Sequence, residues 1–283
     1  MQHLTRLPRP LAAGLIVIAG LLGLYVYIYQ ASPLPGIWSD VYLNLAIVGP
    51  SLLAAYLSTR VLLHFHWEDG PWRMWMYYSL ALWSWAIAEV IWFGVWLAQG
   101  DVPIPSWADV FWLFALAPFA MAFLVQFRLI FSPTPRREAA WMLAISLGVL
   151  LFSGLGTLML GRLAGESAMS WGGTFLEVFY AVVDVAMMIA ALALARTFGR
   201  GLWGRAWWGL LAFALSDGLY SYVNFTGLYA QSVSEGNLLT LVVDSVYSAA
   251  YMLMVLAVWG QLLLMQYGPS LRPSRDDLVE GAR

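Results

Sequence analysis

Long apolar stretches separated by short polar connections are the dominant pattern of this sequence. A run of about 20 apolar residues is long enough to cross the hydrocarbon core of a bilayer as a helix. Eight such runs predict transmembrane helices at residues 11–29, 41–63, 74–98, 107–131, 139–160, 173–195, 206–228 and 238–265. The predicted fold class is therefore all-α, a polytopic membrane helical bundle of eight transmembrane helices.

The composition supports this class. Hydrophobic residues make up 61% of the chain and charged residues 11%, with a mean hydropathy of +0.74, which lies outside soluble globular usage. Residues 1–267 are predicted to form a single membrane domain, followed by a short cytoplasmic tail at residues 268–283. The absence of cysteine excludes disulfides, thiolate metal sites and iron–sulfur clusters.

The distribution of arginine predicts the orientation of the helices, because the chain has no lysine. Alternate connections and both terminal segments carry arginine, whereas the other set of connections carries only Arg162. Positively charged residues of short loops stay on the cytoplasmic side. We therefore expect both termini in the cytoplasm and a protein integral to the bacterial cytoplasmic (inner) membrane.

The chain repeats itself in two halves, at about residues 1–132 and 138–267. Residues 85–89 with Trp92 align with residues 213–217 with Tyr220, and residues 108–109 with Trp112 align with residues 243–244 with Tyr247. The third span thus matches the seventh, and the fourth matches the eighth. Four spans per half predict two parallel four-helix repeats about an axis along the membrane normal, with the binding site at their interface.

Acidic residues inside the apolar runs are the main functional clue. An intramembrane carboxylate is costly unless it is protonated, paired or hydrated, so such residues usually mark an ion, proton or ligand path. Five of them have an aromatic residue three positions later on the same helix face. A sixth, Asp184, follows Glu177 by two helical turns. The predicted ligand-binding residues are Glu89, Trp92, Asp109, Trp112, Glu177, Tyr180, Asp184, Asp217, Tyr220, Asp244 and Tyr247.

The predicted topology places these carboxyl groups in the outer half of the bilayer, where Arg162 is the only basic residue. Shared protons, hydrogen bonds from Tyr, Trp and Ser, or a bound cation would each neutralise them. A hard metal ion needs several oxygen ligands, whereas an amine or quaternary ammonium uses aromatic faces; the choice stays open. In a purely structural interpretation, the carboxyls are bonded within the bundle, and Asp109 only starts a helix after Pro105 and Ser106.

Several other chemistries are excluded or disfavoured. A retinal Schiff base needs a lysine, and bis-histidine haem needs histidines within the spans, where none of the three lies. His64 and His66, with Glu68 and Asp69, have the composition of a metal cluster, but a short polar turn favours a solvated segment. No phosphate-binding loop, nucleophile elbow or basic nucleic-acid patch is present. We therefore expect no enzyme activity, no resident cofactor and no nucleic-acid partner.

Residues 83–92 (WSWAIAEVIW), residues 103–113 (PIPSWADVFWL) and Pro118 carry a family resemblance. The pattern resembles the multi-span membrane input domains found ahead of diguanylate cyclase and phosphodiesterase modules in many bacteria. Those domains commonly show an acidic residue between aromatics, then a Pro-Ser-x-Ala-Asp opening to the next helix. The resemblance implies a sensory membrane module. Because only a short tail follows Met265, we expect a free-standing version that signals through a partner.

The predicted function is a membrane sensor or ligand-binding module. Its acidic and aromatic pocket would take a cation, an amine or a small amphipathic molecule, and a cytoplasmic or membrane protein partner would read the bound state. The first alternative is a proton- or cation-coupled secondary transporter, since parallel repeats with intramembrane carboxylates are also typical of carriers. The second alternative is a structural subunit of a membrane complex, in which the acids contact other subunits.

Overall fold

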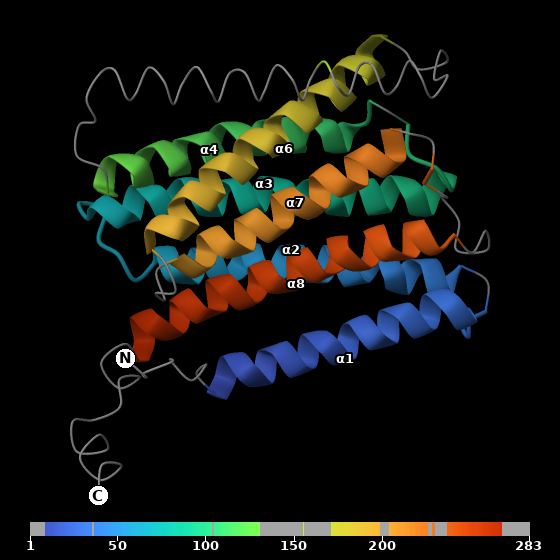
Figure 1. Ribbon diagram of the computed structural model, residues 1–283, viewed down its shortest axis with the longest axis horizontal. Coiled ribbons are helices and arrows are strands. Elements are labelled where there is room, and N and C mark those ends of the chain that lie inside the picture. The colour runs from blue at the N-terminus through green and yellow to red at the C-terminus, as the bar shows by residue number, and fades with distance from the viewer. Residues whose placement is uncertain are drawn as a thin grey trace, which may run out of the picture.

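A computed structural model of the chain describes residues 9–35, 37–103, 105–130, 155, 171–198, 204–225, 228–229 and 237–267. These residues form seven long helices and no strand: α1 (Arg9–Ala31), α2 (Trp38–Leu62), α3 (Gly70–Gln99), α4 (Trp107–Ile130), α6 (Trp171–Phe198), α7 (Arg205–Phe225) and α8 (Leu238–Tyr267). The helices run roughly side by side along the long dimension of the molecule (Figure 1). The predicted all-α class is confirmed.

Seven of the eight predicted helices coincide with these elements to within a few residues. The predicted fifth helix, at residues 139–160, lies outside the described residues except for Leu155, as do the connection between the predicted halves and the tail at 268–283. Among the described helices, six are long and apolar enough to cross a membrane. Helix α7 is the exception, because polar residues such as Ser216, Asp217 and Asn224 lower its hydropathy.

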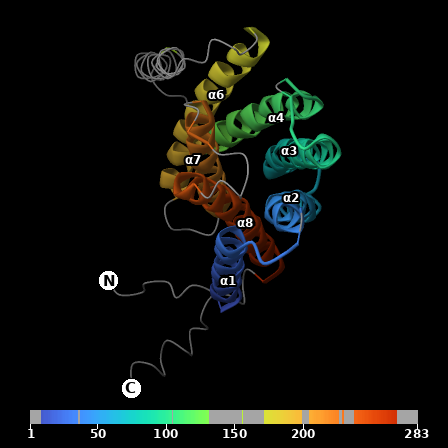
Figure 2. The same ribbon diagram turned by 90° about the vertical axis from the view of Figure 1, so that its right-hand side faces the viewer.

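Six of the helices form a ring, and α1 lies outside it (Figure 2). Neighbours pack in the order α2, α3, α4, α6, α7, α8, and α8 packs on α2 to close the ring. The contact between α4 and α6 is much smaller than the other five, and α1 lies mainly against α8. The rows α2–α3–α4 and α6–α7–α8 therefore meet at one tight seam, α2–α8, and one slight seam, α4–α6.

Large aromatic side chains fill the middle of the ring. Tyr78 and Trp85 of α3 face Trp207 and Phe213 of α7, and all four are buried. The Trp85 and Phe213 rings pack edge to face with centroids 4.9 Å apart, and Tyr78 packs edge to face on Trp207 at 5.8 Å, a geometry that aromatic pairs prefer. The Tyr78 hydroxyl also donates to the Ala206 carbonyl at 3.2 Å. We refer to these four side chains as the aromatic layer.

Small residues let neighbouring helices approach closely, as is typical of helix contacts in membranes. The alanines on the inner faces of α2, α3 and α4 have at most 1% of their surface exposed: Ala54, Ala55, Ala81, Ala86, Ala88, Ala115 and Ala122. Between α7 and α8, Gly209 leaves no room for a side chain, because a Cβ there would lie 2.8 Å from the Cβ of Ala257. Backbone proximity at this contact therefore depends on glycine.

The connection between α3 and α4 is short and sharply turned. Gly100 ends α3 in the left-handed conformation, at φ +77°, which glycine adopts without steric cost. After Pro103 and Pro105, the chain begins α4 at Trp107. The last turns of α3 therefore lie beside the first turns of α4. This end of the bundle, where α1, α3 and α7 finish and α2, α4, α6 and α8 begin, is the cavity end.

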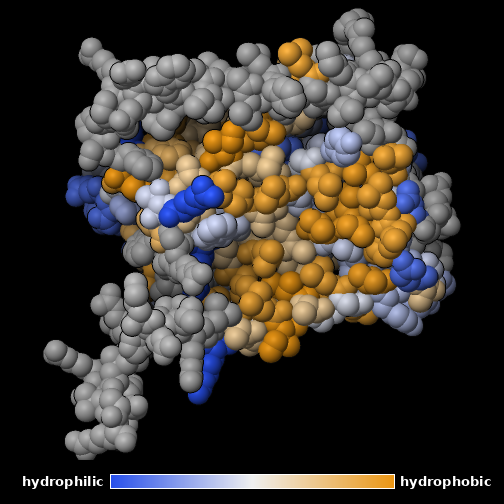
Figure 3. Space-filling model, viewed as in Figure 1, coloured by the Kyte–Doolittle hydropathy of each residue, from blue (hydrophilic) through white to orange (hydrophobic). Residues whose placement is uncertain are grey.

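On the face shown in Figure 3, the surface of the described helices is largely apolar, with hydrophilic residues gathered toward the two ends of the molecule. Side chains such as Ile16 and Phe114 are exposed by 73% and 55%, as contact with lipid requires. Three of the exposed tryptophans lie at helix ends: Trp38 begins α2, Trp107 begins α4 and Trp67 lies between α2 and α3. Such aromatic belts are typical of membrane–water interfaces, and the chain has the features of an integral membrane protein.

Candidate functional site

Glu89 lies on α3 inside the ring and is 5% exposed. Its Oε1 accepts hydrogen bonds from Tyr251 Oη at 2.6 Å, from Trp85 Nε1 at 3.2 Å and from Tyr247 Oη at 3.4 Å. Trp85 precedes Glu89 by one turn of α3, and Tyr247 and Tyr251 are one turn apart on α8. The helical repeat therefore directs all three donors to one point. The buried carboxyl group is satisfied by hydrogen-bond donors rather than by a basic partner.

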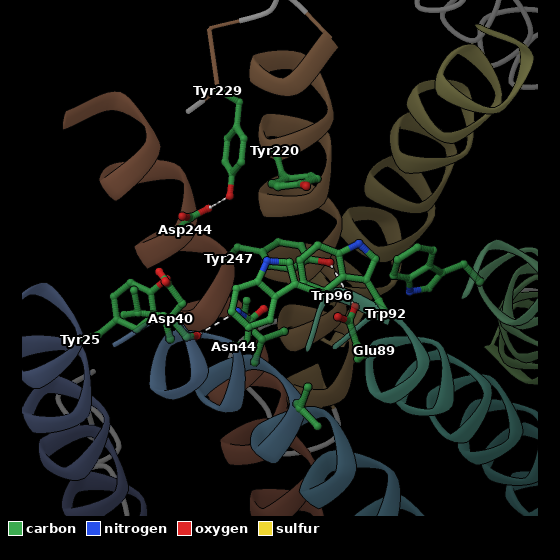
Figure 4. A pocket seen from close by; sticks show the side chains of 14 residues that line it. Tyr25, Asp40, Asn44, Glu89, Trp92, Trp96, Tyr220, Tyr229, Asp244 and Tyr247 are labelled. Carbon is green, nitrogen blue, oxygen red and sulfur yellow. Dashed lines mark hydrogen bonds between the residues drawn. The ribbon is translucent and has the colours of Figure 1, made fainter. Parts of the chain in front are cut away.

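A cavity of about 130 Å³ opens beside Glu89, between α1, α2, α3, α4, α7 and α8. We name it cavity one; Figure 4 shows Trp92 and Trp96 near Glu89, and Asp40 and Asp244 on the other side of the space. Among the described residues its lining combines carboxyl groups with aromatic and polar side chains and contains no basic residue: Tyr25, Asp40, Leu43, Asn44, Ile47, Val48, Glu89, Trp92, Trp96, Trp112, Tyr220, Tyr229, Asp244 and Tyr247.

Asp244 is held by a tyrosine from the connection before α8. Tyr229 Oη donates to Asp244 Oδ1 at 2.8 Å, and the Tyr229 ring packs edge to face on Tyr220 with centroids 5.2 Å apart. Burial raises the pKa of the Tyr229 hydroxyl far above its ordinary value, so the hydroxyl keeps its proton and remains a donor. No second hydrogen bond to the Asp244 carboxyl group is found among the described residues, which leaves acceptor capacity for a ligand.

Asp109 lies in the first turn of helix α4 and caps its start. The structural interpretation of the sequence expected this role. Its Oδ2 accepts from the backbone N–H of Ser106 at 2.6 Å and from the Ser106 hydroxyl at 3.1 Å, while the Ser106 hydroxyl also accepts from the Ala108 N–H at 3.2 Å. This is the reciprocal bonding of a capping box. Asp109 Oδ1 accepts a further bond, from Tyr180 Oη of α6 at 2.9 Å. Asp109 therefore also ties α4 to α6 across the slight seam.

A second cavity, of about 100 Å³, lies between α3, α4, α6, α7 and α8. Within the described part of the chain, cavity two also has no basic lining residue; it is lined by Trp85, Trp92, Val102, Pro103, Ser106, Asp109, Trp112, Leu176, Tyr180, Asp217, Tyr220, Ser221, Asn224 and Tyr247. Four aromatic side chains, one each from α3, α4, α7 and α8, line both cavities: Trp92, Trp112, Tyr220 and Tyr247. We name these four the aromatic partition, because they are common to both cavities.

Asp184 of α6 and Asp217 of α7 are both buried where these helices pack, at 2% and 7% exposed. The two helices are close here, because a Cβ added at Gly218, next to Asp217, would lie 3.7 Å from the Cβ of Asp184. Asp184 Oδ2 has no hydrogen-bond partner among the described residues. The contact between α6 and α7 therefore contains two buried acids.

The predicted site residues divide between the two cavities rather than lining a common one. Glu89 and Asp244 line cavity one, whereas Asp109, Tyr180 and Asp217 line cavity two. The remaining predicted residues are the aromatic partition, which lines both, Asp184, which lines neither, and Glu177, whose side chain lies outside the described part of the structure. Acidic residues from both rows of helices therefore line two neighbouring cavities.

Some lining residues were not predicted. Tyr251 donates the shortest hydrogen bond to Glu89, and its place one turn after Tyr247 would have identified it. Asp40 lies in the first turn of α2, just before the apolar run that predicted the helix. Tyr25 and Tyr229 belong to α1 and to the connection before α8, and no sequence pattern links either of them to Asp244.

Metal-binding geometry is not found in the described part of the chain, which contains no group of three or more His, Cys, Asp or Glu side chains that could hold an ion. In the turn between α2 and α3, Asp69 Oδ2 accepts from the His66 backbone N–H at 2.7 Å, and His64 Nδ1 lies 2.7 Å from the Arg60 carbonyl. These bonds shape the turn itself.

Comparison with known proteins gave no relative of this chain: no family model, no curated protein and no solved structure matches it. Function is therefore inferred from the geometry of the two cavities and their surroundings.

Proposed function

We propose that this protein is a non-enzymatic integral membrane sensor or ligand-binding module, and that cavity one binds a small organic cation. The observation that carries the proposal is the lining of cavity one, where Asp40, Glu89 and Asp244 bring three carboxyl groups to a space that no basic residue lines among those the structure describes. Carboxyl groups in such surroundings are costly unless their charge is compensated. A cationic ligand supplies the compensating charge.

The aromatic side chains favour an organic cation over a metal ion. Trp96 and the aromatic partition line the space beside Glu89 (Figure 4), and indole and phenol faces attract ammonium groups. A divalent metal would instead need several oxygen ligands at short distance, which the described residues do not group together. A compact alkylammonium ion matches both the carboxyl groups and the aromatic faces.

We further propose eight transmembrane helices arranged as two parallel four-helix repeats. Direct contacts between equivalent positions support this arrangement: Tyr78 donates to Ala206 and Trp85 packs on Phe213, and each pair is 128 positions apart. Residues next to a two-fold axis meet their own equivalents, so these contacts are those expected of an axis between α3 and α7. The arginine pattern favours cytoplasmic termini in the inner membrane, which places the cavity end outside.

Signalling would follow from a change in packing between the two rows of helices. Cavity one is lined from α2 and α3 on one side and from α7 and α8 on the other. The rows meet at a tight seam and a slight one, so a ligand that draws them together would bias a packing equilibrium. A partner protein would read that bias, in keeping with the resemblance to membrane input domains.

Transport across the membrane is the main competing function. It requires a path from the cavities to the opposite end of the bundle, whereas the buried aromatic layer fills the middle of the ring between α3 and α7. This filling supports binding without passage. We expect liposomes containing the protein to show no more proton or cation flux than empty liposomes. Flux that disappears in the Glu89→Gln variant would favour the transporter.

Titration calorimetry of the purified chain in lipid nanodiscs, with tetramethylammonium chloride as the probe, tests the binding proposal. We expect saturable binding that sodium chloride at the same ionic strength does not reproduce. Asp244→Asn keeps the side-chain shape and removes the charge, so it should weaken the tightest binding step at least about tenfold, which corresponds to about 1.4 kcal/mol.

Asp101→Asn is the matched control, because Asp101 is exposed and lines neither cavity. Its affinity for the probe should equal that of the parent chain. Absence of saturable binding by the parent chain, or equal losses in the two variants, would contradict the proposed function.

A further inference from the structure

Cavity two is built like cavity one, on the other side of the aromatic partition. In the proposed repeat, Trp92 of α3 is the equivalent of Tyr220 of α7, and Trp112 of α4 is the equivalent of Tyr247 of α8. All four line both cavities. The pseudo-two-fold axis of the repeat therefore maps each member of the aromatic partition onto another member. This is expected for residues that lie around the axis.

The other lining residues of α3 and α7 exchange between the cavities. Glu89 and Trp96 line cavity one, while Asp217 and Asn224, at the equivalent positions of α7, line cavity two. Each pair is separated by the same 128 positions as the contacting pair Tyr78 and Ala206. Each cavity thus has its own carboxyl group beside the aromatic partition, Glu89 in cavity one and Asp217 in cavity two.

The exchange extends to the helices on either side. Asp244 of α8 lines cavity one, and its equivalent on α4, Asp109, lines cavity two. When α2 is aligned with α6 at a single sequence offset, two more residue pairs have one member in each cavity. They are Leu43 with Leu176 and Ile47 with Tyr180. Correspondence over three helix pairs indicates that the repeat has produced two versions of one binding site.

We infer that cavity two is a second cation site, so that the chain binds two small alkylammonium ions, one on each side of the aromatic partition. This inference rests on the proposed function, because it assigns to cavity two the ligand class proposed for cavity one. Asp109 and Asp217 supply carboxyl groups, none of the described lining residues is basic, and the partition presents aromatic surface to both spaces.

The two sites differ in strength. Among the described residues, cavity two has two lining carboxyl groups where cavity one has three, and both oxygens of Asp109 already accept bonds from Ser106 and Tyr180. Asn224 also replaces the aromatic face that Trp96 provides in cavity one. Two cations on either side of one partition repel each other. We therefore expect the second binding step to be about tenfold weaker than the first.

Stoichiometry in the tetramethylammonium titration tests the second site. We expect two ions per chain, with the tighter step weakened at least about tenfold in Asp244→Asn and the weaker step unchanged. Ser221→Trp fills cavity two without changing a carboxyl group, so it should remove the weaker step and leave the tighter one unchanged within about twofold. Leu215→Trp is the matched control, because Leu215 lies on the outer face of the same helix and is 53% exposed.

A gain-of-affinity variant keeps the test decisive if Ser221→Trp does not fold. Asn224→Trp gives cavity two the side chain that cavity one has at the equivalent position, and an added aromatic face should tighten the weaker step about three- to tenfold. A single ion per chain, bound more weakly in Asp244→Asn and indifferent to Ser221→Trp and Asn224→Trp, would overturn the second site and leave the proposed function intact. No binding at all would overturn both.

Discussion

Glu89 shows how this chain stabilises a buried carboxyl group without a basic partner. Three donors converge on one oxygen, and Tyr251 is the closest, at 2.6 Å. The hydroxyls of Tyr247 and Tyr251 also lie 3.2 Å apart, and Trp85 Nε1 lies 2.8 Å from the Tyr251 hydroxyl, so the donors form a connected network. Removing one donor leaves a buried acceptor underpaired, which costs more than the net gain from making the bond.

Tyr251→Phe should therefore lower the free energy of unfolding by about 1–3 kcal/mol. The ring and its packing remain, and the hydroxyl is lost with its bonds to Glu89, Trp85 and Tyr247. Unfolding by SDS in mixed micelles, followed by tryptophan fluorescence, measures the change.

Tyr27→Phe is the control for this measurement, because Tyr27 is on α1 and is 57% exposed. Its effect should stay within about 0.5 kcal/mol. Comparable losses in the two variants would show that the hydroxyl network around Glu89 contributes nothing specific to stability.

At the scale of the helices, the slight seam between α4 and α6 is the weakest part of the ring. The hydrogen bond from Tyr180 to Asp109 crosses this seam at its cavity end. Tyr180→Phe should loosen the start of α6, because few other contacts hold it against α4. Hydrogen–deuterium exchange should then be faster at residues 173–180 and unchanged in α2 and α3. Unchanged exchange at residues 173–180 would mean that this bond does not hold the seam.

The contact between α7 and α8 depends on a glycine, Gly209, because there is no room for a side chain at this position. At Gly209 an added Cβ would lie 2.8 Å from Ala257 Cβ and 3.3 Å from the Met254 backbone. Gly209→Ala should therefore destabilise the protein by about 1–3 kcal/mol, as overpacking does, measured by the same SDS unfolding.

Gly20→Ala is the matched substitution on a free helix face, since nothing lies within 4 Å of a Cβ at Gly20. Alanine forms helix better than glycine by about 1 kcal/mol, so this variant should be neutral or slightly stabilising. The same sign of effect in both variants would contradict the close α7–α8 approach.

At the scale of the whole molecule, the proposed orientation can be tested directly because the chain has no native cysteine. Asp101→Cys places a thiol at the cavity end, and Glu68→Cys places one at the opposite end; both positions are exposed. A membrane-impermeant maleimide should label Asp101→Cys in intact cells, and Glu68→Cys only after the membrane is opened. The reverse pattern would invert the topology and place the cavities on the cytoplasmic side.

Sequence patterns predicted the elements and many of the lining residues. Each apolar run that falls within the described residues is a helix, and the acid–aromatic spacing identified Glu89, Asp217, Asp244 and the aromatic partition. Other features around the two cavities could not be predicted from the nearby sequence. Tyr229 reaches Asp244 from a connection, and Asp184 lies near Asp217 on another helix, so both depend on how distant segments are placed.

From the sequence by itself follow the helical membrane fold and the presence of buried acids, because an apolar run of span length satisfies its backbone in lipid only as a helix. Only the tertiary structure decided that these acids divide between two cavities with a common aromatic wall. That outcome depends on the rotation of each helix about its axis and on the fit of side chains between helices far apart in the chain, which interlock at close-packed density.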